Sequence, residues 1–160
     1  MIKKISEKDI PECVQVIKDS FLTVANEFNF TEENAARFTA LAINNERLLW
    51  QYNEQRPMFG YYNDNGKIVG YFSLEIKDNS ECELNNLCVL PAYRHQKIGG
   101  LLLEYAFDKA AEMNCTKMNI GIVEENKMLR KWYENYGFKH IGTQKYDFFP
   151  FTCGYMEKEL

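Results

Sequence analysis

The run from Tyr93 to Gly100 combines basic side chains with two adjacent glycines, directly before an apolar segment. Leu87–Leu90 is a short apolar run that Pro91 ends, which predicts a strand because the residue before a proline favours extended geometry. The apolar spacing after Gly100 predicts an amphipathic helix to about Met113. The first amides of a helix lack internal partners and carry the positive end of its dipole, so this segment predicts a phosphate-binding loop.

Charge and backbone freedom both favour an anion at this loop. Arg94, His95 and Lys97 supply positive charge, and the glycines allow the backbone to approach a phosphate closely. The loop matches neither the dinucleotide fingerprint G-x-G-x-x-G nor the P-loop G-x-x-x-x-G-K-[ST], so nucleotide binding by those routes is not expected. The residues expected to bind the phosphate-bearing ligand are Arg94, His95, Gln96, Lys97, Ile98, Gly99, Gly100 and Leu101.

Composition limits the remaining possibilities. With 160 residues and 46% hydrophobic content, the chain can build one core, and we expect one domain over residues 1–160. A net charge of −4 with scattered basic residues argues against a nucleic-acid partner. The chain shows neither a signal-type start nor a membrane-length apolar run, so we expect a cytoplasmic protein with no membrane partner. Five cysteines without C-x-x-C pairing predict reduced, mostly buried thiols and no metal site.

The first half of the chain reads as one strand, several helices and a hairpin. Lys67–Ile76 and the strand before it flank an Asn65-Gly66 pair, which predicts a hairpin turn with this pair in left-handed positions. The predicted elements are a strand at Ile2–Ile5, a helix capped by Asp9 with Pro11 in its first turn, a helix capped by Thr31 with Ala35, Phe38, Leu41 and Ala42 on one face, a helical piece at Glu46–Tyr52, and strands at Met58–Tyr62 and Lys67–Ile76.

The second half alternates strands and helices. A strand, a helix and a strand in succession predict a right-handed parallel crossover. Asn126 is expected to cap a helix through Tyr136, which Gly137 ends in the left-handed cap position. The predicted elements are a strand at Cys82–Leu90, a helix at Gly99–Met113, a strand at Thr116–Val123, the capped helix, and closing strands at Phe138–Tyr146 and Thr152–Glu159.

Two motifs in this order resemble the GNAT superfamily of acyl-CoA-dependent N-acetyltransferases. Val89–Gly100, V-L-P-A-Y-R-H-Q-K-I-G-G, is similar to the family's V-x-P-x-x-R-x-x-G-x-G/A, in which backbone amides hold the CoA pyrophosphate. Asn126, Leu129, Tyr133 and Gly137-Phe138 match N-x-x-A-x-x-x-Y-x-x-x-G-F, with Leu129 where alanine is usual. The resemblance covers essentially the whole chain.

Lys97 stands where the first motif has glycine. If that glycine serves close approach of the backbone, a side chain there crowds the phosphate. If the position already has helical geometry, Lys97 loses nothing and adds a charge contact. We expect the second of these.

The resemblance implies an α/β (α+β) fold, with a mixed, mostly antiparallel twisted sheet flanked by helices. It also implies acetyl-CoA as cosubstrate and direct acetyl transfer to a primary amine in a ternary complex. In that reading Asn126 contacts the pantetheine arm, and the amides of Leu87, Cys88 and Val89 lie near the thioester. Val89 is the favoured donor to the thioester oxygen if its strand diverges from the neighbouring strand.

The chemistry needs a free amine and a protonated leaving group. An alkyl amine titrates near ~10.4, so only on the order of 1 in 2000 molecules is free base at neutral pH. Glu83 is our candidate base, although a glutamate near ~4.3 needs desolvation or a relay through water to take that proton. An ordinary solvated strand residue is an equal alternative for Glu83. Tyr133 is expected to face the sulfur, where a phenol near ~10 stays protonated and can donate; an amphipathic core tyrosine is the alternative.

Several alternatives stay open at this stage. An acyl-CoA-binding sensor or interaction module would keep the phosphate loop without turnover. The acceptor can be a small-molecule amine or a peptide or protein amine, and the chain a monomer or homodimer. Glu27, Glu32 and Glu33 could attract a cationic amine, but exposed helix carboxylates are usually only solvated. Cys88 is expected to be a small buried residue rather than a nucleophile, because no paired histidine is evident.

Overall fold

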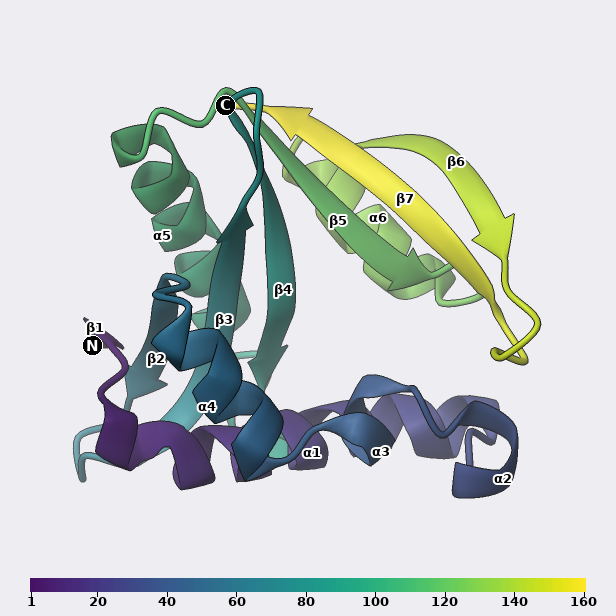
Figure 1. Cartoon of the computed structure of the whole chain (residues 1–160), viewed down its shortest axis with the longest axis horizontal. Helices are drawn as coiled ribbons and strands as arrows, with labels where there is room; N and C mark the ends of the chain where they lie inside the picture. The colour runs from purple at the N-terminus through teal and green to yellow at the C-terminus, as the bar shows by residue number, and fades with distance from the viewer.

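A seven-stranded sheet organises the chain in this computed structural model, which describes all residues, Met1–Leu160 (Figure 1). Its strand order is β1-β2-β3-β4-β5-β7-β6, and only β4 and β5 pair in parallel, so the predicted mixed, mostly antiparallel sheet and parallel crossover are confirmed. The strands are β1 Ile2–Lys4, β2 Met58–Tyr62, β3 Ile68–Ile76, β4 Glu81–Val89, β5 Lys117–Val123, β6 Lys139–Lys145 and β7 Thr152–Glu159.

Helices cover both faces of the sheet. Gly70 on β3 meets Leu102 and Ile98 of α5, because a Cβ at this glycine would contact both side chains. The next residue, Tyr71, points to the opposite face, where Cys13 of α1 lies close. None of the helices has the length and apolar character of a membrane span. The helices are α1 Ile10–Phe28, α2 Glu32–Ala35, α3 Thr39–Ala42, α4 Asn45–Asn53, α5 Ile98–Glu112 and α6 Lys127–Asn135, with short 3-10 turns η1 Glu7–Asp9 and η2 Pro91–Tyr93.

The helix predicted from Thr31 to Ala42 is wrong as a single element, because the chain forms α2 and α3 with a break between them. Helix α2 ends at Ala35, and Phe38, at the N-cap of α3, is extended with φ −65° and ψ 142°. Its ring turns into a small aromatic cluster, 5.0 Å from Phe30 and 6.0 Å from Phe151 between ring centroids. Burying these rings together outweighs continuous helical hydrogen bonding over a short segment.

The hairpin between β2 and β3 is confirmed, with a different turn from the one predicted. Gly66 is left-handed at φ 77°, but Asn65 is not. Instead, the Asn63 side-chain oxygen accepts hydrogen bonds from the amides of Asn65 and Lys67, at 3.0 Å each. A polar side chain therefore closes this loop around one left-handed glycine.

The parallel strands β4 and β5 separate after a short stretch of pairing. Their register runs from Glu81↔Lys117 to Glu83↔Asn119 and then stops. Figure 1 shows the two strands meeting at the top of the view and diverging below. Opposite the same part of β4, the register with β3 shifts between Tyr71 and Ser73, and Asn86 has a left-handed φ of 55°. The bulge and the divergence together open the sheet at the middle of β4.

Candidate active site

The loop before α5 presents a row of unused backbone donors. None of the N–H groups from His95 to Gly100 donates a hydrogen bond within the protein, and the first amide to do so is that of Leu101, to the Lys97 carbonyl at 3.0 Å. Left-handed residues at His95 (φ 62°) and Lys97 (φ 66°) turn the chain here. Such a row at the positive end of a 15-residue helix is suited to an oxyanion. The loop therefore has the donors that the sequence predicted for a phosphate.

The expectation that Lys97 has helical geometry is wrong. Its φ of 66° and ψ of 4° lie in the left-handed region, where glycine is favoured over residues that carry a Cβ. The motif glycine is thus replaced at a position where the backbone conformation requires glycine-like freedom. Lys97 still presents its amide at the helix start, with its side chain exposed to solvent.

The two glycines at the start of α5 have different surroundings. A Cβ on Gly100 would collide with the hydroxyl of Tyr136, directly after α6, so this glycine allows the start of α5 to approach the end of α6. A Cβ on Gly99 would lie 3.6 Å from the Trp132 ring, an ordinary contact distance. Gly99 is therefore the residue that tolerates a small side chain without disturbing α6.

Arg94 is turned into the protein rather than toward the loop amides. Its guanidinium donates to the Val89 carbonyl at 3.1 Å, to the Ser20 carbonyl at 2.9 Å and to the Thr23 hydroxyl at 3.1 Å. The charge expected to face a phosphate instead ties the end of β4 and the loop to α1. In this structure Arg94 positions the loop, which corrects the simpler expectation of a direct charge contact.

The Val89 amide points into the opening between β4 and β5. The next amide, that of Leu90, donates to the Val69 carbonyl at 2.9 Å, so it points toward β3. The backbone N–H and C=O groups of successive strand residues point to opposite edges, so those of Val89 point away from β3. In agreement, the Val89 carbonyl accepts its hydrogen bond from Arg94 and not from β3. Because β5 no longer pairs with β4 at this level, the Val89 N–H lies on an uncovered edge. The divergence on which its predicted role depends is present.

Tyr133 is the buried residue of α6, at 6% exposure. Its ring packs edge-on against Trp132 and Phe138, at centroid distances of 5.0 and 5.3 Å. Its hydroxyl has no hydrogen-bond partner within the protein. Burial, followed by the nearby Cys88 sulfur, raises the pKa of Tyr133 well above its usual range. The phenol therefore stays protonated and can act only as a donor at working pH.

Glu83 is the last residue of β4 that pairs with β5, directly before the opening. Its carboxylate lies 3.5 Å from the Lys77 ammonium and is 38% exposed. The pKa of Tyr155 on β7 is raised by burial, by its hydrogen bond with Tyr146 and, more weakly, by the negative charge of Glu83. Glu83 therefore lies between the two diverging halves of the sheet.

The other expected residues lie at the start of α6, on β4 and in the core. The Asn126 oxygen accepts from the Leu129 amide at 3.3 Å, which confirms it as the cap of α6. Burial raises the pKa of Cys88 to about 12, so its thiol is not a nucleophile at neutral pH. All the cysteines are free thiols, and all but Cys153 are buried, as expected. Leu87 lies beside the bulge, half-buried.

A cavity of about 340 Å³ that the sequence did not predict adjoins the bulge of β4. Its residues come from separate segments, so no local pattern announces it. Only the Asn85-Asn86 pair within an apolar strand was a usable signal, because asparagine tolerates the left-handed geometry of a bulge. Glu27, Glu32 and Glu33, considered for a cationic amine, are exposed and do not line it. The cavity is lined by Arg37, Thr39, Ile43, Arg47, Trp50, Gln51, Arg56, Glu75, Asn85 and Asn86.

Known proteins resemble this chain along its length. The sequence profile of the acetyltransferase (GNAT) family matches residues 20–138. An uncharacterised N-acetyltransferase of Lactobacillus delbrueckii subsp. lactis is 27% identical over 143 residues, covering 85% of this chain and 82% of that protein. Another from Mycobacterium tuberculosis is 25% identical over 114 residues, covering 71% of this chain and 73% of that protein.

Solved structures share the fold. The PaiA N-acetyltransferase of Thermoplasma acidophilum, in complex with coenzyme A, aligns with a TM-score of 0.84 and 22% identity, over 100% of this chain and 98% of that chain. The ribosomal-protein-alanine N-acetyltransferase of Brucella melitensis aligns with a TM-score of 0.76 and 21% identity, over 100% of this chain and 99% of that chain. Profile, relatives and fold agree, and the chain belongs to the GNAT family of acetyl-CoA-dependent N-acetyltransferases.

Proposed function

We propose that this protein transfers the acetyl group of acetyl-CoA to a primary amine by direct attack in a ternary complex. The proposal rests on one observation: two sets of backbone N–H groups without protein partners lie at the start of α5 and at the end of β4. The amides from His95 to Gly100 suit the pyrophosphate, and the Val89 amide suits the thioester oxygen. The residues present thus fit an acyl-CoA that runs from the start of α5 into the opening of the sheet.

Each end of the cosubstrate would be held by different chemistry. The loop amides bind the pyrophosphate, with Lys97 adding a positive charge beside them. The Asn126 oxygen is used by the helix cap, so its amide nitrogen is the group left to contact the pantetheine arm. Arg94 contributes by fixing the loop to α1 rather than by touching the phosphates.

In the reaction, the amine nitrogen attacks the thioester carbon, a C–N bond forms and the C–S bond breaks. The nitrogen releases one proton to solvent as it becomes an amide, and the leaving sulfur takes one up from solvent, so the protons balance. The Val89 amide stabilises the negative charge that develops on the oxygen. Tyr133 donates a hydrogen bond to the leaving sulfur, which takes up a proton to become the CoA thiol. Its raised pKa makes complete proton transfer from the phenol costly, so stabilising the developing thiolate is its main service.

The ammonium proton must leave before attack. Glu83 is the proposed acceptor, directly or through water, because it lies just before the opening where the amine must arrive. This carboxylate is 38% exposed beside Lys77, so water can reach it. Relay through water to bulk solvent therefore fits this site better than direct transfer.

Incubation with acetyl-CoA and an amine panel tests the proposal through free-thiol release and product mass. Initial rates with both substrates varied should give intersecting reciprocal plots, and the protein mass should stay unacetylated without amine. Parallel plots or an acetylated protein would overturn direct attack. Tight CoA binding without turnover of any amine would identify a binding module instead.

A further inference from the structure

The cavity beside the bulge of β4 has an unusual charge for an acidic protein. Three arginines and one carboxylate line it, in a chain whose net charge is −4. It adjoins Asn85 and Asn86, between Glu83 and Val89 on the strand that borders the proposed reaction point. The cavity therefore lies where an amine acceptor can approach the thioester. It is separate from the cosubstrate loop, His95–Gly100.

Two of the arginines have no protein anion to neutralise them. Neither Arg37 nor Arg47 makes a side-chain hydrogen bond or an ion pair within the protein. Arg56 differs, because it pairs with Glu54 at 3.2 Å and Glu75 at 3.5 Å. The free positive charge of the cavity is thus concentrated on the helical side, at Arg37 and Arg47.

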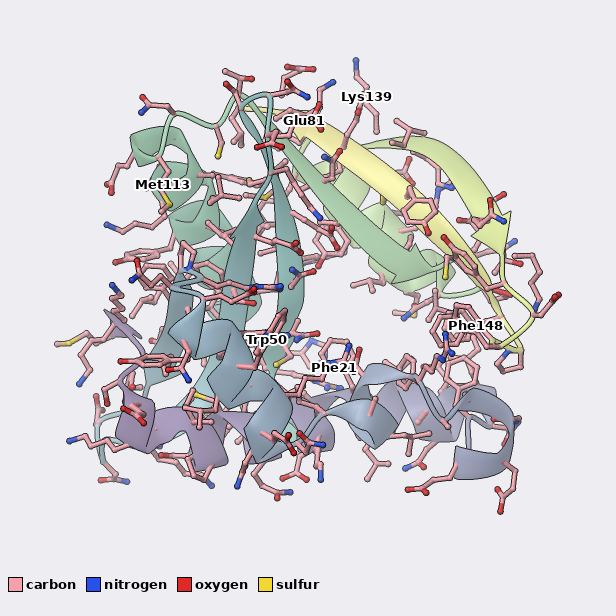
Figure 2. All side chains as sticks on the ribbon, viewed as in Figure 1. Phe21, Trp50, Glu81, Met113, Lys139 and Phe148 are labelled. Atoms are coloured by element: carbon pink, nitrogen blue, oxygen red, sulfur yellow. The ribbon has the colours of Figure 1, made fainter.

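Arg37 is held in place without using its N–H groups. Its guanidinium lies over the ring of Phe148, with the central carbon 4.2 Å from the ring centroid. Phe148 sits at the β6–β7 connection and reaches toward the segment between α2 and α3 (Figure 2). This contact with the ring uses none of the N–H donors of Arg37, so they remain available for a carboxylate or phosphate.

The cavity also offers acceptors, one from β3 and one from α4. Glu75 supplies a carboxylate, and the Gln51 side-chain oxygen is buried without any hydrogen-bond partner. A buried acceptor without a donor is costly unless a ligand supplies the missing N–H. The cavity therefore carries donors for an anion together with acceptors for an ammonium or amide.

Building on the proposed acetyltransferase function, we infer that the acceptor is a small primary amine that also carries an oxyanion group. A carboxylate or phosphate on the acceptor binds Arg37 and Arg47, and its amino group is directed toward the opening of the sheet. The volume of about 340 Å³ is at the small end of ligand pockets, near ~300–1,000 Å³, which favours a metabolite over a long peptide. Polyamines and other polycations are disfavoured by the same charges.

A matched set of amines tests this inference. The set is β-alanine, β-alaninamide, 2-aminoethylphosphonate and 1,3-diaminopropane, with L-leucine and L-leucinamide as an α-amino pair. Rates are compared as kcat/KM per concentration of free base, because the carboxamides have less basic amines. We expect at least one acid to exceed its carboxamide and the diamine by about tenfold or more. The phosphonate and carboxylate arms distinguish the two sources of negative charge.

Charge variants locate the effect. Arg47→Gln and Arg37→Gln should each lower kcat/KM for the preferred acid about tenfold through KM, and leave its carboxamide within about twofold. Arg47→Glu should reverse the preference toward the diamine. Lys4→Gln is the matched control, because it removes one positive charge from an exposed strand residue with no ion pair. It should leave kcat/KM unchanged for both the acid and its carboxamide.

Calorimetry with CoA-loaded protein separates this inference from the proposed reaction. Binding of an anionic amine that Arg47→Glu abolishes would support the cavity assignment even if no amine were acetylated. Turnover with a carboxamide or diamine preferred over its acid would leave the reaction standing and overturn the inference. If the Arg37 and Arg47 variants kept both the affinity and the rate for the anionic amine, the inference would also be overturned.

Discussion

The cosubstrate loop and the arginine-lined cavity are built on opposite principles. From His95 to Gly100 the protein offers backbone N–H groups. The charged side chain next to them, Arg94, is hydrogen-bonded to α1 and holds the loop in place. Around the cavity the donors and acceptors are side chains from the segment between Arg37 and Arg56 and from the strands β3 and β4. A backbone site is indifferent to many substitutions, whereas a side-chain site changes its ligand with a single residue.

This difference matches what each site must recognise. Every acyl-CoA presents the same pyrophosphate, so a fixed row of amides is sufficient. Acceptors differ in charge and size, and specificity toward them needs replaceable side chains. In the proposed reaction, the two regions meet at the opening of the sheet, beside Val89 and Tyr133.

The largest effect is expected where the two regions meet. Tyr133→Phe keeps the packing of the ring against Trp132 and Phe138 but removes the donor to the leaving sulfur. Losing such a donor typically costs ~10²–10³ in turnover. Turnover at saturating acetyl-CoA and amine, with CoA affinity by calorimetry, measures this. A near-parental turnover number, with chemistry shown to be rate-limiting, would mean that Tyr133 is only a core residue.

A negative charge on the cosubstrate loop should break the backbone site alone. Gly99→Asp places a carboxylate at the helix start, and repulsion at about 5 Å with an effective dielectric near ~20 corresponds to roughly 10² in CoA affinity. Gly99→Ala is the control, because the added Cβ has room beside Trp132, and its CoA affinity should stay within about threefold. Gly100→Asp should weaken CoA too, but its clash with Tyr136 would mix folding with binding. Equal affinity of Gly99→Asp and parent would move the pyrophosphate elsewhere.

The sequence could predict the backbone site because the whole site lies in one short stretch. The strand ended by Pro91, the glycine pair and the helix that follows are all contiguous, and the closing strand Thr152–Glu159 was predicted with its observed bounds. The insertion of β7 between β5 and β6 depends on pairing over long range. The break between α2 and α3 depends on where Phe38 finds its aromatic partners. Neither is written in local periodicity.

The side-chain site could not be predicted for a related reason. Arg37, Arg47 and Arg56 lie in different segments, and exposed arginines on helices are usually only solvated. What joins them is the tertiary packing of α3 and α4 against α1, which brings these helices to the cavity beside β3 and β4. Arg94 shows the reverse error, since a basic residue in the right motif turned out to bind protein oxygens.

Alkaline pH should weaken the fold that supports both sites. Burial raises the pKa of Cys82 and Cys88 to about 12 and that of Cys13 further, whereas unfolded thiols titrate near ~8.5. Between these values the unfolded chain has lost protons that the native chain keeps, so the free energy of unfolding falls as pH rises. Where a thiol is fully protonated in the native chain and fully ionised in the unfolded chain, the free energy of unfolding falls by about 1.4 kcal/mol per pH unit for that thiol. Urea midpoints at pH 8 and pH 10 measure this, and an equal midpoint would contradict it.

The smallest expected effect separates backbone shape from charge at the one position where the cosubstrate loop departs from its motif. Lys97 is left-handed, which costs a residue with a Cβ about 1 kcal/mol relative to glycine. Lys97→Gly should therefore raise the free energy of unfolding by about that amount, because strain relief exceeds the added entropy of the unfolded chain. Lys97→Ala keeps the Cβ and loses the charge, so it should gain no stability. Since the amide is presented equally in all three proteins, CoA affinity should fall by no more than about threefold in either variant, and by the same factor in both. A tenfold loss in both would show that the ammonium, rather than the row of amides, dominates pyrophosphate binding, and would remove the contrast between the two sites.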